Sequence, residues 1–474
     1  MTHAVVIGGG LAGLLAARVL ARHADKVTII EGDTYPQGPQ QRKGLPQGRQ
    51  NHMLMAGGAE ALEQLLPGTL ARLAAAGAHT LAMGSDMLTL SSEGWFRTFD
   101  DDSYTIACSR PLIDHIVRSQ VLEDPAVTVL QATKAVALSG DANAVTGVAV
   151  ERADRSEAVI SADLVIDASG NRSKSPAWLA DLGLPTVSEE FVDAGLTYAG
   201  REYEAPEQAA KQFPGVLIQT VPGTGQPGRG AAFMPQEDGR WIVSLIGTQG
   251  GQPPTQDEGF ADFARDMRDP IVAELMATAR PLTEVRGSRG LANRRRLWHK
   301  LPLPDGFLAI GDAVMVLSPN YATGMSMAAF GALALRTRLK THGLAPGLSR
   351  AVQKDIAAAG TGPWTMASTT DLFFPGVKTN ITVRGAAMQQ SIGARYARTA
   401  AANEDVLRAV YEVSTLRSPQ SRMMSLPLLL AVLRGPGKPP LTAEQARAQF
   451  PQIGDLLAQH TPPHLHDTPA RTPR

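Results

Sequence analysis

Three glycines near the N-terminus have the spacing of a dinucleotide-binding turn. The letters GGGLAG at residues 8–13 match the pattern G-x-G-x-x-G. An apolar run at 4–7 predicts a strand before the turn, the residues from 11 to about 22 predict a helix after it, and 27–30 predict a second strand. A glycine triplet alone is a weak signal, whereas the order strand, turn, helix, strand makes it specific.

Each residue of this turn has a physical reason to be there. Gly8 permits the tight turn, Gly10 lets the backbone approach a pyrophosphate, and Gly13 lets the helix pack closely on the strand. Leu11 and Ala12 lie in the first turn of the helix, whose free N–H groups and partial positive charge favour phosphate. These five residues are therefore predicted to bind a dinucleotide.

An acid follows at the distance that a ribose requires. Glu31 comes directly after the second predicted strand, eighteen residues beyond Gly13. Its carboxylate can accept hydrogen bonds from both ribose hydroxyls and would repel a 2′-phosphate, which disfavours NADP. This pattern is common to NAD and FAD sites, so other motifs must separate them.

Two further segments end an apolar strand on an acid. The first is LVIDASG at 164–170, which carries Asp167. The second is FLAIGDA at 307–313, which carries Gly311 and Asp312. A carboxylate at the C-terminal end of a buried strand can accept from a sugar hydroxyl. After the second acid the chain bends and a helix begins without an ordinary cap, at Pro319, Gly324 and Met325.

The composition is that of a globular protein with no general affinity for charged partners. Of 474 residues, 43% are hydrophobic and 19% charged, and 45 Lys and Arg balance 45 Asp and Glu. The balance argues against nucleic acid or a membrane as a partner. The single cysteine, Cys108, excludes an internal disulfide, and the N-terminus lacks a signal-peptide layout. The longest apolar run near the C-terminus, LPLLLAVL at 426–433, is too short to span a bilayer, so a cytoplasmic location is predicted.

The pattern along the chain predicts one nucleotide-binding fold interrupted by insertions. Alternating β patterns lie between 190 and 250, and helices are predicted at 59–76, at 111–122, from 255 to about 267 and at 384–416. We predict the first part of a nucleotide-binding domain at 1–185, a β-rich substrate domain at 186–285, the return of the first domain at 286–345, a helical region at 346–459 and a disordered tail at 460–474.

The leading glycine motif, the mid-chain Asp-Ala-Ser-Gly and the late Gly-Asp-Ala together resemble the FAD-dependent monooxygenases of the para-hydroxybenzoate hydroxylase fold. The resemblance spans roughly residues 4–335, and the three motifs are specific in combination. It implies an α/β protein with a Rossmann-like FAD-binding domain of the glutathione-reductase type, an inserted β-sheet substrate domain and a helical C-terminal region. It also implies FAD as the cofactor, used with O₂.

The resemblance suggests how FAD would lie. Asp312 would accept from a ribityl hydroxyl, and the helix start at Gly324 and Met325, beside Pro319, would face the N1–O2 edge of the flavin. The other FAD contacts that the resemblance implies are Arg110 at a helix start, Arg42 and Lys43 in a loop, and Asp167.

A finer resemblance is carried by three segments: RKGLPQGRQNH at 42–52, RWIVSLIG at 240–247 and NRRRLWHKLPLPDGFLAIGDA at 293–313. They look like the flavin-dependent epoxidases of polyether ionophore biosynthesis in bacteria. That resemblance implies epoxidation of an alkene in a polyene polyketide by a flavin C4a-hydroperoxide. The hydroperoxide would form from O₂ and reduced FAD. NAD(P)H would reduce the FAD, directly or through a separate reductase. Because such chemistry mainly needs water exclusion and orientation, no catalytic acid or base is assigned.

A long apolar pocket suits a polyene, and the β segment at 215–250 offers a wall for it. The candidates are Val216, Ile218, Phe233 and Trp241, each equally compatible with the core. The sequence leaves open whether the polyketide is free or attached to a carrier protein.

Two other enzymatic functions stay open. An aromatic hydroxylase would use a polar clamp or base near the ring, which the sequence does not reveal. A non-redox polyketide cyclase would retain FAD as a structural element, and Ser318, where the family often has Asn or Asp, is compatible with it. No serine-hydrolase, C-x-x-C or H-E-x-x-H motif is present, no metal site is predicted, and a sensor is disfavoured because no output domain is visible.

Overall fold

A parallel five-stranded sheet forms the centre of the N-terminal part of the chain, with the order β21-β12-β1-β2-β8. The computed structural model describes residues 1–460, so the tail predicted at 460–474 lies, apart from its first residue, outside the described residues. The strands are β1 (His3–Ile7), β2 (Lys26–Ile30), β8 (Val127–Leu130), β12 (Leu164–Asp167) and β21 (Phe307–Ala309). The fold is mixed α/β, as predicted.

The register of this sheet brings the ends of its strands together. Ile7 is paired with Ile30 on one side and with Asp167 on the other, and Asp167 is paired with Ala309. Because these strands are parallel, the residues that follow them meet at one edge. We call it the strand-end edge; it carries Gly8, Glu31, Ala168 and Gly311.

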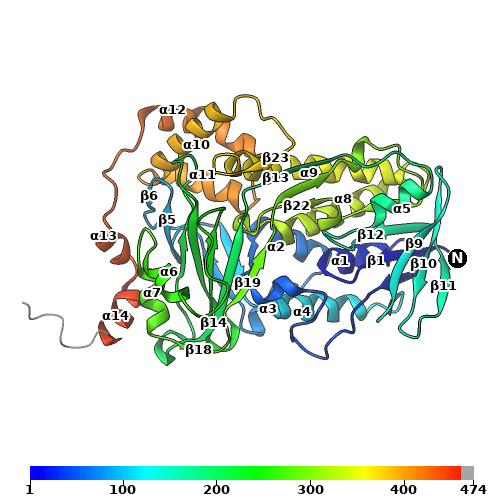
Figure 1. Cartoon of the computed structure of the whole chain (residues 1–474), viewed down its shortest axis with the longest axis horizontal. Helices are drawn as coiled ribbons and strands as arrows, with labels where there is room; N and C mark the ends of the chain where they lie inside the picture. The colour runs from blue at the N-terminus through cyan, green and yellow to red at the C-terminus, as the bar shows by residue number, and fades with distance from the viewer. Residues whose placement is uncertain (461–474) are drawn as a thin grey trace, which may run out of the picture.

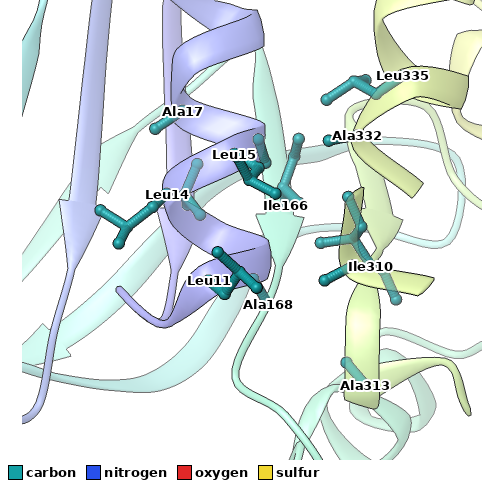
Figure 2. Close-up of a cluster of buried hydrophobic side chains, with 14 of the residues drawn as sticks. Leu11, Leu14, Leu15, Ala17, Ile166, Ala168, Ile310, Ala313, Ala332 and Leu335 are labelled. Atoms are coloured by element: carbon teal, nitrogen blue, oxygen red, sulfur yellow. The ribbon is translucent and has the colours of Figure 1, made fainter. Parts of the chain in front are cut away.

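Helices pack on this sheet and on one another (Figure 1). They are α1 (Leu11–Leu20), α4 (Arg110–Leu122), α8 (Gly324–His342) and α9 (Leu348–Asp371). Figure 2 shows Leu15 of α1 beside Ile166 of β12 and Leu11 of α1 beside Ala168. Ile310, which follows β21, and Leu335 of α8 complete the cluster. Since all of these side chains are buried, the start of α1 has a fixed position relative to the third motif.

A second, mostly antiparallel sheet has eight strands in the order β18-β14-β17-β16-β15-β5-β6, with β19 also paired to β14. They are β5 (Met87–Ser91), β6 (Gly94–Trp95), β14 (Thr197–Glu204), β15 (Gly215–Ile218), β16 (Arg229–Gln236), β17 (Arg240–Gly247), β18 (Arg280–Pro281) and β19 (Arg286–Arg289). One face packs against α6 (Phe260–Arg265), α7 (Ile271–Ala277), α13 (Ala443–Arg447) and α14 (Pro451–His460). The predicted β-rich segment thus supplies the middle of a sheet that also recruits β5, β6 and β19.

Smaller elements surround these two layers. Three short sheets consist of β9 (Lys134–Gly140), β10 (Val145–Glu151) and β11 (Glu157–Ser161); of β3 (Met53–Met55), β7 (Tyr104–Ala107) and β4 (His79–Ala82); and of β22 (Met315–Val316), β20 (Asn293–Arg296), β13 (Glu189–Asp193) and β23 (Lys378–Thr379). The other helices are α2 (Ala56–Leu65), α3 (Thr69–Ala75), α5 (Ser175–Asp181), α10 (Ala386–Ala400), α11 (Glu404–Ser414) and α12 (Leu426–Arg434). Over residues 1–460, no helix combines the length and apolarity needed to cross a membrane.

Candidate active site

The glycine turn leaves open space in front of α1. Gly8 has φ +98°, and a Cβ there would lie 2.6 Å from the carbonyl oxygen of Ala168. A Cβ on Gly13 would lie 1.9 Å from the carbonyl oxygen of Gly8, so only glycine permits this packing. A Cβ on Gly10 would meet nothing within 4 Å. Gly10 thus faces the kind of open space that a pyrophosphate needs.

The third motif reaches the same place. Gly311 has φ +64°, and a Cβ there would lie 2.6 Å from the Cβ of Ala12 in the first turn of α1. Leu11, beside it, is buried in the core. The structure therefore brings the first and third motifs into contact, although they are three hundred residues apart.

Glu31 is held by the glycine turn and by Arg42. Its Oε2 accepts from the Gly9 N–H at 2.9 Å, and its Oε1 accepts from the Asp33 N–H at 2.8 Å. Arg42 Nη1 lies 3.2 Å from Glu31 Oε2, and Arg42 Nη2 donates to the carbonyl oxygen of Gly9 at 3.1 Å. Lys43 is exposed and forms no ion pair among the described residues. The structure brings Arg42, but not Lys43, to the strand-end edge.

Residues that the sequence did not single out complete this ion-pair cluster. Asp114 lies 3.5 Å from Arg42 Nε and 2.8 Å from Arg118 Nη1. The ring of Tyr35 lies 5.2 Å from the Arg42 guanidinium and 4.9 Å from that of Arg118, and its hydroxyl donates to the Gly9 carbonyl. Two cations over one aromatic ring stiffen the cluster. The i, i+4 spacing of Asp114 and Arg118 was the one available sequence signal.

Arg110 lies close enough to both Asp312 and His52 for their charges to interact. Arg110 is the first residue of α4, and its buried Nε has no hydrogen-bond partner among the described residues. Asp312 is accessible to solvent, yet burial raises the pKa of its carboxyl while Arg110 lowers it. Burial likewise lowers the pKa of Arg110, against the opposing effect of the Asp114 and Asp312 charges.

His52 was quoted in a motif but not assigned a role. The pairing of Met53 with Ala107 brings it close to the start of α4. Its Nδ1 lies 2.8 Å from the Gln50 carbonyl oxygen, which can only accept, so the proton is on Nδ1. Burial, aided by the Arg110 charge, lowers the pKa of His52 to about 4. At neutral pH its Nε2 is therefore a hydrogen-bond acceptor without a partner in the described chain.

The start of α8 is also open. Gly324 would place a Cβ in empty space, whereas Met325 is buried in the core cluster. Pro319 is exposed at the start of the short 3-10 helix η6 (Pro319–Tyr321). The buried hydroxyl oxygens of Thr323 and Ser326 have no partner among the described residues. Buried polar groups are nearly always satisfied, so these orphans point to a ligand or water.

Asp167 differs from the other acids of the motifs. It is completely buried, and its carboxylate accepts from the N–H and hydroxyl of Ser169 and from the hydroxyl of Ser173. Its bonds therefore organise the loop that packs on Gly8, and the structure does not direct it toward a ligand.

The four residues predicted to form a substrate wall lie in the core. Val216, Ile218, Phe233 and Trp241 are between 0% and 2% exposed, in the cluster beneath α6, α7 and α14. Side chains alternate along a strand, so their neighbours face the other way. On that opposite face, Ser244 Oγ accepts from the Asn51 N–H at 3.1 Å, directly beside His52. This face, and not the predicted one, meets the strand-end edge.

A buried polar cluster holds the loop before α8. Asp371 accepts from the Tyr321 hydroxyl at 2.7 Å and from Asn293 Nδ2 at 2.6 Å. Asn293 Oδ1 in turn accepts from the Ser318 N–H at 2.7 Å. Burial raises the pKa of Asp371 to about 6, against the two hydrogen bonds. These residues come from separate segments, and no sequence signal connects them.

The donor set fits FAD. Open space lies at Gly10 and at Gly324, and Asp312 has an accessible carboxylate. Arg110 Nε and the hydroxyls of Thr323 and Ser326 at the start of α8 have no partner among the described residues. The helix α8 contacts the Gly311–Ala313 turn, which follows β21 at the strand-end edge. Pyrophosphate, ribityl hydroxyls and the polar rim of a flavin would satisfy such groups. No cluster of His, Cys, Asp or Glu within residues 1–460 has the arrangement to hold a metal ion.

Comparisons with known proteins agree with this fit. The model of a family described as "FAD binding domain" matches residues 1–342. Protein Rv3254 of Mycobacterium tuberculosis (strain ATCC 25618 / H37Rv) is 31% identical over 388 residues, which cover 78% of this chain and 80% of that protein.

Solved structures share the fold at low sequence identity. The flavin-dependent brominase Bmp2 has a TM-score of 0.64 and 15% identity, covering 91% of this chain and 99% of that one. The p-nitrophenol 4-monooxygenase PnpA of Pseudomonas putida DLL-E4 has a TM-score of 0.63 and 15% identity, covering 88% and 99%. With a family match over residues 1–342 and a curated relative above 30% identity, this chain belongs to the FAD binding domain family and has the fold of flavin-dependent monooxygenases.

Proposed function

We propose that the protein is an FAD-dependent monooxygenase that epoxidises an alkene of a polyene polyketide. The observation that carries the proposal is the strand-end edge, where the opening at Gly10 lies with the acids Glu31 and Asp312. The helix α8, whose start is open at Gly324, contacts the Gly311–Ala313 turn of this edge. Bound FAD supplies the redox chemistry: one oxygen atom of O₂ goes to the alkene and the other to water, with two electrons from NAD(P)H, delivered directly or by a separate reductase.

The chain's own residues bind, orient and exclude water. Gly10 and the start of α1 would admit the phosphates, and Asp312 would accept from a ribityl hydroxyl. Arg110 would place its unpartnered Nε–H on the same cofactor. His52 would offer Nε2 as an acceptor for a hydroxyl of cofactor or substrate, because it stays neutral near pH 7.

An alkene substrate is supported by the apolar surroundings of the site. Met53 and Met55 of β3 belong to one buried cluster with Met234 and Ile242, on the sheet face opposite to the predicted wall. Methionines adapt to irregular apolar shapes, and a dry site protects oxygen transfer.

The test uses purified protein reconstituted with FAD. A polyene, free or attached to a carrier protein, and a set of phenols are supplied with NAD(P)H, with and without a flavin reductase. We expect ¹⁸O₂ to label an epoxide of the polyene, with one NAD(P)H consumed per epoxide. Labelled hydroxylation of a phenol alone would replace the proposal by an aromatic hydroxylase. Product formation without O₂ and with oxidised FAD would replace it by a non-redox cyclase.

A further inference from the structure

The exposed apolar side chains of the C-terminal region gather on two helices. Leu426, Leu430 and Leu433 of α12 are 68%, 41% and 64% exposed. Their spacing of four and three residues puts them on one stripe, while Leu428 and Val432 point into the core. Met424 before α12, and Met388 and Ile392 on α10, are exposed as well. Because α10 and α12 are in contact at the outer edge of the molecule (Figure 1), we call these six residues the α10–α12 face.

The segments that carry this face are strongly basic. Residues 372–403 and 413–443 contain no Asp or Glu, although the whole chain has 45 of them. The cations of the two segments are Lys378, Arg384, Arg395, Arg398, Arg417, Arg422, Arg434 and Lys438. Of these, Lys378, Arg384, Arg434 and Lys438 are exposed and have no ion-pair partner among the described residues. The balanced total charge, which predicted no membrane partner, conceals this local excess.

An apolar stripe that ends on one unpaired cation, Arg434, and is followed by a second, Lys438, fits an anionic surface. Leucines on an exposed helix can enter the boundary of the acyl chains while Lys and Arg reach the phosphate groups. A second copy of the chain fits poorly, because a two-fold interface would set this face against itself. That arrangement would bring the four unpaired cations of one copy toward the four of the other, with no acid in these segments to separate them.

We propose that the α10–α12 face docks the protein on an anionic lipid surface, with Leu426, Leu430 and Leu433 entering the interface. The apolar side chains beneath the face continue inward. Tyr396, Tyr411 and Val432 belong to the same buried cluster as Met53 and Met55. If the proposed function holds, a lipophilic polyene would approach the enzyme from the side that faces the lipid. The docking itself does not depend on that function.

The test is sedimentation of the full FAD-loaded chain with vesicles. Phosphatidylcholine vesicles and vesicles that also contain phosphatidylglycerol are compared at low and high salt. We expect binding to the anionic vesicles that weakens with salt. The double variant Leu430→Gln, Leu433→Gln should bind about tenfold or more weakly, because two leucine side chains that enter the lipid in the native chain are lost. Arg434→Gln and Lys438→Gln should each weaken binding about fivefold, from about 1 kcal/mol per cation.

Matched controls test whether loss of any exposed apolar or basic side chain would weaken vesicle binding, or only loss from this face. Val159→Gln and Lys134→Gln alter exposed residues of β11 and β9, far along the chain from the face, and should leave binding unchanged. All of these positions are exposed, so the variants should fold and keep FAD. Failure of the native chain to sediment with anionic vesicles would overturn the proposal. The proposal would also be overturned if the leucine variant bound the vesicles as tightly as the native chain. It would be overturned too if light scattering showed a native dimer that Leu430→Gln, Leu433→Gln converts to a monomer.

An acidic protein that bound this face in place of lipid would give the same loss with the variants but no sedimentation with vesicles, and would likewise overturn the proposal. Oxygenase activity on a dispersed substrate is measured alongside. Vesicle binding by a protein without such activity would reject the proposed function and keep the docking.

Discussion

The Glu31 carboxylate and the Arg42 guanidinium lie 3.2 Å apart, with both side chains almost fully buried. Each also binds the Gly9 backbone, Glu31 through the N–H and Arg42 through the carbonyl oxygen. The glycine turn is therefore clamped from two sides by a single ion pair. Asp114 and Asp33 share the same cation, at 3.5 Å and 3.7 Å.

Removal of Arg42 should unclamp the turn. Arg42→Ala leaves Glu31 and Asp114 buried with less compensating charge, a change that costs about 3–5 kcal/mol when a buried pair loses one partner. We expect a lower free energy of unfolding for the apoprotein and weaker FAD binding, measured by urea denaturation and by quenching of flavin fluorescence. Lys43→Ala removes an adjacent exposed cation and should change neither quantity. Equal effects of the two variants would contradict the clamp.

Two glycines of the turn should respond differently to an added side chain: one should lose FAD binding and the other stability. Gly10→Val places its side chain in open space at φ −78°, so the apoprotein should fold with nearly native stability but lose FAD binding. Gly13→Ala would put a Cβ 1.9 Å from the Gly8 carbonyl oxygen and should lower the melting temperature of the apoprotein. Calorimetry of both apoproteins and FAD titration check this. If the Gly10→Val protein bound FAD as tightly as the native chain, the pyrophosphate would not lie at Gly10.

The strand-end edge was predictable because the chain marks it chemically. Each central apolar run ends at or just before Gly8, Glu31, Asp167 or Gly311, and a parallel sheet places these strand ends at one edge. The helices α1 and α4 also follow the predicted bounds to within two residues. The sequence was sufficient to predict an element wherever the spacing of apolar residues and the residues that end the element agreed.

Other boundaries depended on details that the apolar period hides. The helix predicted at 59–76 is broken into α2 and α3 at Pro67 and Gly68, the latter with φ +86°. The helix predicted at 384–416 restarts at Asn403, whose side chain caps α11 by accepting from Val406 N–H. The helix predicted from 255 begins only at Phe260, after Gly259 with φ +76°.

The substrate wall could not be placed from sequence because both faces of the eight-stranded sheet are buried. Alternation assigns Phe233 and Trp241 to one face, but it does not say which face meets the cofactor side. The helices α6, α7 and α14 cover that face, and they come from distant parts of the chain. The cluster around Asp371 was hidden for the same reason, since only the folded chain joins it to Asn293 and Tyr321.

Asp312 should be the acid on which FAD retention depends. Asp312→Asn removes the charged acceptor, and a hydrogen bond to a charged group is worth about 1.5–3 kcal/mol, so the Kd for FAD should rise about ten- to a hundredfold. Equilibrium dialysis against FAD measures the change. Asp181→Asn, at an exposed position at the end of α5, is the control and should bind FAD like the native chain. An unchanged Kd in the Asp312 variant would remove this residue from the site.

His52 should remain neutral through the range where ordinary histidines take up a proton. Its pKa is lowered to about 4, so histidine-selective NMR should show one imidazole among the ten that does not titrate above about pH 5. That signal should vanish in His52→Gln. The unfolded chain protonates this group first as the pH falls below 6.5, so His52 makes stability decrease toward acid. Ten signals that all titrate near their ordinary pKa would contradict the assignment.

Asp371 should give a pH dependence of the opposite sign. Its pKa is raised from 3.8 to about 6, so between these values the native chain holds a proton that the unfolded chain has released. The contribution of this group to the free energy of unfolding is therefore present below about pH 4. It is lost as the pH rises through about 6, by roughly 3 kcal/mol at most.

Asp371→Asn cannot ionise, so the difference in unfolding free energy between native chain and variant should decrease across this window, as measured by urea denaturation at several pH values. Tyr321→Phe supplies the matched variant. It removes the hydroxyl that donates to Asp371 and lowers its pKa, so the loss of stability should shift to higher pH. Parallel pH profiles for the native chain and Asp371→Asn would mean that the buried carboxyl titrates normally. In that case the loop before α8 is held by geometry alone, without the proton on Asp371.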